Sequence, residues 1–241
     1  GMSSNTEYLD QYCERLGPEL WAEPVNAVTN LAFIAAALWL WRRYLKQFPS
    51  GCDRCFSHYW LIFLVGLIGL GSGLFHTFAT TWSEWADVIP ILLFQLSFLW
   101  VYLRQISKTS WRYSLLWLTG FIGVNVLLVW SGSSLAELTN GSIMYLPAIV
   151  AVGWIGMDYQ ERVQQGGWQI LAAASLFCFS LTFRTLDHNV CEFWSLGTHF
   201  VWHLLNAVVL ALCTWAVIRQ PHNGEENSPS STPAPASRVN L

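Results

Sequence analysis

The chain has 241 residues and a formal net charge of −3, with 54% hydrophobic and 11% charged residues. A soluble domain usually has about 25% charged residues, so this composition cannot cover a water-soluble globule with charge. It also excludes a disordered chain, which needs low hydrophobicity and high net charge. Nucleic-acid binding is excluded as well, because the chain offers no basic stripe to neutralise phosphates. The composition therefore indicates an integral membrane protein.

The apolar stretches predict the fold, since a helix that crosses a membrane needs about 20 mostly apolar residues. Seven stretches meet this requirement: 27–45, 58–79, 86–104, 112–130, 143–158, 168–185 and 198–218. We expect an all-α integral membrane bundle of seven transmembrane helices. An acidic segment (1–22) would precede this helical domain (23–219), and a disordered cytoplasmic tail (220–241), rich in polar residues and proline, would follow it.

The basic residues predict the orientation, because positive charge favours the cytoplasmic side of a membrane. Ten of them lie in the first, third and fifth connections and the tail, whereas only Arg15 and Arg184 lie on the opposite side. The N-terminus is therefore expected outside the cell or in a lumen, and the C-terminus in the cytoplasm. The membrane would be the inner membrane of a bacterium, or that of the ER or Golgi in a eukaryote.

Ionisable residues inside a membrane are costly and mark functional sites. His76, Asp87, His199 and His203 fall at a similar depth in the outer half of the predicted spans. His199 and His203 are four residues apart and project from one helix face. With His76 they can form a three-histidine zinc site with an open fourth position, and Ser72 lies one turn before His76. The alternatives are a hydrogen bond between helices for the histidine pair and a helix N-cap for Asp87.

The other three histidines are expected to be solvated or interfacial. His58 and His222 fall on the predicted cytoplasmic side, and His188 falls in a predicted loop.

The segment before the first span is acidic. It holds Glu7, Asp10, Glu14, Glu19 and Glu23 against Arg15 alone. Such a run is usually a solvated face, but oxygen-rich clusters are also what calcium requires. Glu14 and Glu23 could share a calcium ion.

The cysteines allow one bridge on the oxidising side of the membrane, where disulfides persist. Of the six cysteines, only Cys13 and Cys191 fall on the predicted outer side, whereas the others lie in the cytoplasm or within spans. The topology therefore predicts a Cys13–Cys191 bridge that ties the N-terminal segment across the mouth of the histidine site. Two free thiols and a mobile, hydrated segment are the alternative.

These residues, in this order and spacing, resemble the alkaline ceramidase family, which belongs to a superfamily of seven-helix membrane hydrolases that includes the adiponectin-type receptors. The resemblance runs from Tyr12 to about Arg219. It rests on Ser72, His76 and Asp87, on the closing H-x-x-x-H of His199 and His203, and on Cys13-Glu14, Glu23-Pro-Val-Asn26 and Asn30 near the N-terminus. One departure is the shorter interval between Cys13 and Glu23, which leaves Leu16 or Gly17 where a polar calcium ligand is expected.

The resemblance implies a zinc-dependent amidase that cleaves a ceramide-like membrane lipid into a fatty acid and a sphingoid base. By this analogy His76, His199 and His203 hold zinc, while Ser72 and Asp87 interact with the attacking water and the amide carbonyl. No obligate protein partner is expected. A seven-helix receptor with a structural zinc ion, or a hydrolase of another lipid amide or ester, are the alternatives.

Overall fold

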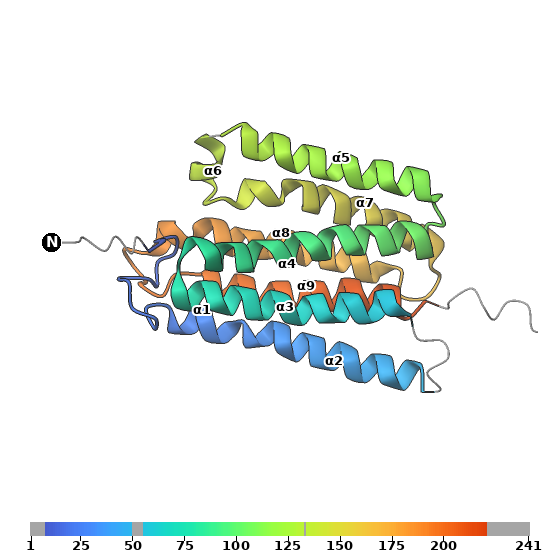
Figure 1. The fold of residues 1–241 in the computed structure, drawn as a ribbon, viewed down its shortest axis with the longest axis horizontal. Coiled ribbons are helices and arrows are strands. Elements are labelled where there is room, and N and C mark those ends of the chain that lie inside the picture. The colour runs from blue at the N-terminus through green and yellow to red at the C-terminus, as the bar shows by residue number, and fades with distance from the viewer. Residues whose placement is uncertain (1–7, 50–54, 133, 221–241) are drawn as a thin grey trace, which may run out of the picture.

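The helices of the computed structural model run side by side along its long axis (Figure 1). The structure describes residues 8–49, 55–132 and 134–220, and within them seven helical segments are long and apolar enough to cross a membrane. They are Pro24–Gln47, Phe56–Phe78, Thr81–Ile106, Trp111–Trp130, Ser142–Arg162, Trp168–Val190 and His199–Ile218. The predicted all-α bundle of seven membrane-spanning helices is confirmed, whereas the orientation of the termini stays a prediction.

The helix boundaries correct three of the predicted spans. The elements are α1 (Pro24–Thr29), α2 (Leu31–Gln47), α3 (Phe56–Phe78), α4 (Thr81–Val101), η1 (Tyr102–Ile106), α5 (Trp111–Trp130), α6 (Ser134–Leu138), η2 (Ser142–Tyr145), α7 (Leu146–Arg162), α8 (Trp168–Val190) and α9 (His199–Ile218). The first span is two helices joined at Asn30. The third begins at Thr81, because Thr80 and Ser83 form a capping box there, and the sixth continues to Val190.

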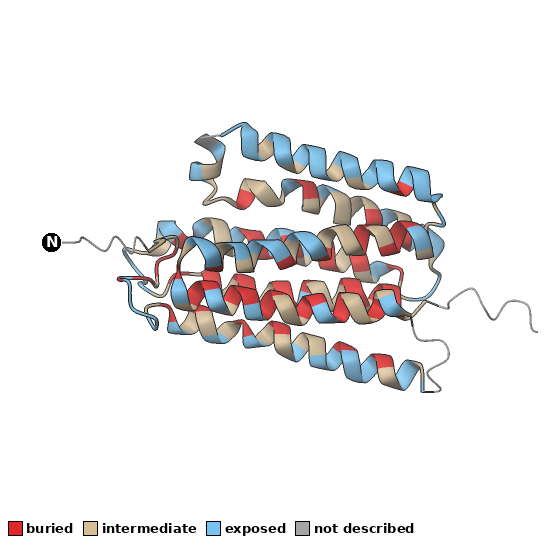
Figure 2. Cartoon of the chain, viewed as in Figure 1, coloured by how far each residue is buried: buried red, intermediate tan, exposed pale blue. Residues whose placement is uncertain are grey.

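Helices α3 and α9 form the centre of the bundle. Helix α3 contacts α2, α4 and α9, and α9 also contacts α2 and α8. Figure 2 shows buried residues along both helices, whereas α5 at the edge of the bundle is mostly exposed. Glycines allow the close packing, because a Cβ at Gly69 would lie 2.8 Å from Cβ of Phe33, and one at Gly71 would overlap the Ala86 carbonyl oxygen. The close approach at Gly71 brings α4 against the part of α3 that carries Ser72.

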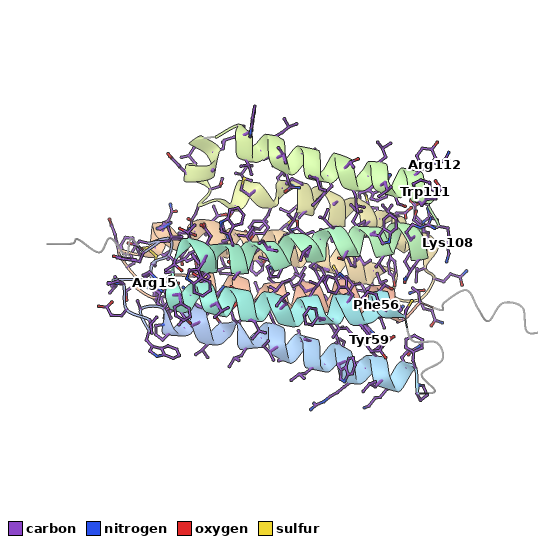
Figure 3. All side chains as sticks on the ribbon, viewed as in Figure 1. Arg15, Phe56, Tyr59, Lys108, Trp111 and Arg112 are labelled. Carbon is purple, nitrogen blue, oxygen red and sulfur yellow. A yellow bond between two sulfur atoms is a disulfide. The ribbon has the colours of Figure 1, made fainter. Side chains whose placement is uncertain are left out.

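The N-terminal segment from residue 8 to residue 23 folds over one end of the bundle. The Leu9 amide donates to the carbonyl of Ala79, just after α3. Figure 3 shows Arg15 at this end of the molecule and Lys108 and Arg112 at the other. The described acidic residues of this segment therefore lie in a stretch of chain that is hydrogen-bonded to the helical domain. Most of the predicted tail lies outside the described residues.

Candidate metal centre

Three histidines meet at the end of the bundle that the N-terminal segment covers. His76 lies in the last turn of α3, and His199 and His203 lie in the first two turns of α9. One ring nitrogen of each lies within 4.8 Å of the others. All three residues are only 1–2% exposed. The fold thus brings together the three histidines that the sequence places on two separate helices.

Hydrogen bonds define the tautomer of two of these rings. Nδ1 of His76 lies 2.5 Å from Oε2 of Glu23, and a carboxylate can only accept. Nδ1 of His203 lies 2.9 Å from the Thr29 hydroxyl, which itself donates to the carbonyl of Val25 at 2.7 Å. Since that hydroxyl has one hydrogen, it must accept from His203. Both rings therefore carry their proton on Nδ1 and leave Nε2 as a bare electron pair.

The bare nitrogens fit a metal ion. Within the described part of the chain, Nε2 of His76, Nε2 of His203 and Nδ1 of His199 are buried atoms without a hydrogen-bond partner. An unsatisfied buried polar group costs about 1–3 kcal/mol, and three of them on three neighbouring rings would be an unusual concentration. Imidazole nitrogens are ligands that zinc prefers, and three of them leave the open fourth position typical of catalytic zinc. The residues present therefore fit zinc.

The residues behind the histidines hold their rings in place. Glu23, only 1% exposed, also accepts from Arg15 at 2.5 Å and from Asn26 at 3.1 Å. Burial alone would raise the pKa of Glu23, but the bonds from His76, Arg15 and Asn26 lower this pKa below its usual value. On the other side, Tyr12 stacks on His199 with ring centroids 3.7 Å apart. A hydrogen-bonded carboxylate such as Glu23 orients a metal-binding imidazole and raises its basicity.

Asp87 and Ser72 line the same cavity as His199 and His203. Asp87 lies in the second turn of α4, and the N-cap of that helix is Thr80. The alternative interpretation of Asp87 as an N-cap is therefore wrong. Ser72 is 5% exposed and is a polar neighbour of the Asp87 carboxylate. A hydroxyl and a carboxylate thus line the same cavity as two of the three histidines.

The two glutamates predicted to share calcium have protein partners instead. Glu14 accepts hydrogen bonds from the amides of Val25 and Asn26, both at 2.7 Å, at the start of α1. Burial raises the pKa of Glu14 in spite of these bonds. Glu23 uses one oxygen for Arg15 and the other for His76. Calcium binding by this pair stays a prediction that these contacts do not favour.

A disulfide joins Cys13 to Cys191, with Cα atoms 5.2 Å apart, and ties the N-terminal segment to the end of α8. Beside it, the fully buried Asp187 accepts amide hydrogen bonds from Cys13 at 2.9 Å, Thr198 at 2.7 Å and His199 at 2.9 Å. Gly197, with φ +67°, packs against this carboxylate. One side chain thus connects the disulfide to the first turn of α9, where His199 lies.

Sequence reasoning missed several of these residues. Arg184 and Asp187 stand near the end of an apolar stretch, where an ionisable residue signals function. Arg184 lines the histidine cavity, donates to the carbonyl of Asn140, and has its Cζ 5.3 Å from the centre of the Tyr145 ring. Tyr12 and Thr29 had no such signal, because an aromatic ring and a threonine are common at helix ends.

The predicted exposure of one of the remaining histidines is wrong. His58 was expected to be solvated or interfacial, but it is 2% exposed, with Nε2 3.2 Å from Oε1 of Gln105. It lies at the far end of α3 from His76. His188, expected in a loop, is an exposed residue in the last turn of α8. His222 and Cys52 lie outside the described residues.

Two further spaces adjoin the histidine cavity. An apolar cavity inside the bundle shares Ile68, Ile91 and Tyr145 with it. A groove of about 760 Å³, lined by residues of α4 and α5, shares Glu84 and Arg184 with it. The histidine cavity therefore shares lining residues with both an apolar cavity and the groove.

The fold and the site define a bundle of membrane-spanning helices with a buried three-histidine group that could hold a metal ion and an acidic residue in the cavity beside it. The family model described as Ceramidase matches residues 11–232. The chain belongs to the ceramidase family, and the suspected resemblance is confirmed. A search of curated proteins found no match. Family membership supports a hydrolase that acts on the amide bond of ceramide-like lipids.

Proposed function

We propose that the protein is a zinc-dependent intramembrane amidase that hydrolyses ceramide-like lipids to a fatty acid and a sphingoid base. The family match supports the reaction and the substrate class. Zinc dependence is supported by the group of buried ring nitrogens without hydrogen-bond partners on His76, His199 and His203. Zinc in such a site supplies a Lewis acid that activates water and polarises a carbonyl.

The side chains around the centre have separate roles in this proposal. Asp87 holds the proton taken from the attacking water and returns it to the leaving amine, which is general acid–base catalysis. Ser72, next to Asp87, orients that carboxylate and the amide carbonyl. Glu23 and Thr29 keep the Nδ1 atoms of two ligands protonated, so that both Nε2 atoms stay available. Amides are poor electrophiles, which is why each of these contributions is needed.

The larger of the two spaces beside the centre suits a lipid chain. The groove of about 760 Å³ has room for a hydrocarbon chain, whereas the apolar cavity next to Ile68 and Tyr145, at about 80 Å³, has room for only a few methylene groups. The groove along α4 and α5 provides an opening through which the lipid reaches the centre from the bilayer. The polar residues Glu84 and Arg184, shared by the groove and the histidine cavity, then lie near the headgroup.

The direct test is mass spectrometry of a membrane lipid extract incubated with the purified protein, with and without a zinc chelator. Ceramide-like amides should decrease while fatty acid and sphingoid base appear in equal amounts, and the chelator should stop this. His203→Ala protein is the control for contaminating hydrolases. Hydrolysis of a different lipid amide or ester instead would show that the proposed substrate class is wrong. Bound zinc without turnover of any lipid would favour a receptor with a structural zinc ion.

A further inference from the structure

A buried arginine lies behind the histidine centre, although it is not on a membrane-spanning helix. Arg15 belongs to the N-terminal segment, and its side chain has no exposed surface. Figure 3 shows it at the end of the bundle where this segment folds over α3. Burying a guanidinium is costly unless it is paired and hydrogen-bonded. The residues that surround Arg15 therefore show what the charge is used for.

The guanidinium of Arg15 donates hydrogen bonds to four oxygen atoms. Nε donates to Oε1 of Glu23 at 2.5 Å, and Nη1 donates to the carbonyls of Gly17 at 3.0 Å and Glu19 at 3.2 Å. Nη2 donates to the carbonyl of His76 at 3.0 Å. One carboxylate and three carbonyls are the kind of ligands that a calcium ion takes. Here a guanidinium lies among them.

Arg15 reaches His76 by two routes. It binds Oε1 of Glu23, whose Oε2 accepts from Nδ1 of His76 at 2.5 Å. It also binds the backbone carbonyl of His76, which lies in the last turn of α3, where carbonyls lack helical partners. The guanidinium thus restrains both the ring and the backbone of the same residue.

We propose that Arg15 is a positioning residue that serves as the built-in cation of this centre, in place of a second metal ion. Its charge compensates Glu23, and its contacts aim that carboxylate at His76. The affinity of the histidine centre for zinc then depends on Arg15, although Arg15 does not touch the metal position. This inference rests on the proposed zinc site.

The decisive measurement is the dissociation constant for zinc, obtained by competition with a chelator, in wild-type protein and in Arg15→Gln. Loss of a partner behind a metal ligand lowers metal affinity about 10–100-fold, and this is the expected effect. Arg162→Gln is a matched control, because Nε of Arg162 binds Asp158 at 2.7 Å in an ion pair far from the histidines, with the arginine side chain 43% exposed. This control should bind zinc like the wild type.

A double-mutant cycle separates positioning from a general loss of structure. Glu23→Gln should weaken zinc binding to a similar extent. Arg15→Gln/Glu23→Gln should lose less than the sum of the two single variants, because one of the two routes from Arg15 to His76 runs through Glu23. Independent, additive losses would contradict the proposal. If Arg15→Gln does not fold, Arg15→Lys takes its place in the cycle. Since it keeps the charge, it should retain more zinc affinity than Glu23→Gln, and an equal loss would overturn the proposal.

Two further readouts do not depend on turnover. The visible absorption spectrum of protein loaded with Co²⁺ reports ligand geometry, and should change in Arg15→Gln but not in Arg162→Gln. Millimolar calcium should leave the thermal stability and zinc affinity of the wild type unchanged, and a rise in either would refute the built-in cation. Wild-type protein that binds no zinc would refute the proposed function itself. Wild type that binds zinc, with unaltered affinity in Arg15→Gln, would refute only the role of Arg15.

Discussion

Helices α3 and α5 are similar as sequences but differ in the folded protein. Both are apolar, contain glycines and are long enough to cross a membrane. Helix α3 has neighbours on several sides and carries Ser72 and His76. Helix α5 lies at the edge of the bundle, and Ser114 is its single buried residue (Figure 2). A Cβ added at Gly120 or Gly123 of α5 would meet nothing within 4 Å.

The difference shows that hydrophobicity alone does not place a helix within a membrane bundle. Because lipid is as apolar as a protein interior, an apolar side chain is stable on either side of α5. Small residues that meet another backbone, and polar residues that find partners, distinguish the central helix. Ser72 and His76 have such partners at one end of α3, under a segment fastened by a disulfide. Helix α5 has no comparable group of buried polar residues among those the structure describes.

The largest effect on zinc content and activity is expected at the histidines. They lie on α3 and α9, whereas α5 carries none. His76→Ala and His203→Ala should each lower zinc content and reduce lipid hydrolysis below detection, because each removes one of three ligands. Metal analysis and an amidase assay on the same preparations would measure both. The control is His58→Gln, at the other end of α3, which should keep zinc and activity. Full zinc occupancy in His203→Ala would contradict the proposed centre.

The next largest effect is expected at Asp87, which α4 presents to the cavity beside α3. If Asp87 moves the proton, Asp87→Asn should keep zinc but lose about 10²–10⁴-fold in rate. Asp158→Asn, at the opposite end of the bundle, should be nearly normal in rate. The measurement is kcat for each variant together with its zinc content. Activity of Asp87→Asn within a few-fold of the wild type would remove Asp87 from the mechanism.

The third prediction concerns the stability that the disulfide of the N-terminal segment gives to the protein. Cys13→Ser/Cys191→Ser should lower the free energy of unfolding by about 2–5 kcal/mol, the usual cost of losing a native disulfide. Cys178→Ser is the control, because Cys178 is an exposed free cysteine. Thermal denaturation in detergent measures the effect. Alkylation of both Cys13 and Cys191 without reductant, in active protein, would show that the bridge does not form in solution.

The smallest effect is expected from two matched glycine substitutions, and it tests the comparison of α3 with α5 directly. In Gly71→Ala the new Cβ would overlap the Ala86 carbonyl oxygen. Overpacking of this kind costs about 1–3 kcal/mol, and a lower rate should accompany it, since α4 also carries Asp87. Gly120→Ala should be at least as stable as the wild type, because alanine favours a helix. Equal behaviour of the two variants would mean that α3 and α4 are not in close contact.

The sequence by itself determined the class of protein and identified the polar residues that gather at its centre. Seven apolar stretches of sufficient length leave no other architecture for the chain, because backbone groups in a bilayer must be satisfied within helices. His199 and His203 are neighbours at i and i+4 whatever the rest of the fold does. His76 and Asp87 were recognisable because ionisable residues are rare in such stretches. These inferences depend on local periodicity and on the cost of polar groups in lipid.

The tertiary structure alone decided which partners these residues have. Glu23 could be read from the sequence as a calcium ligand, but only the folded segment shows that its oxygens face Arg15 and His76. Asp87 resembled an N-cap until α4 was found to begin at Thr81, with Thr80 as its N-cap. Asp187 gained its role from three amides that are distant in the chain or lie beyond the helix end. Such contacts join segments far apart in sequence, and the local pattern of residue types carries no information about which of them will meet.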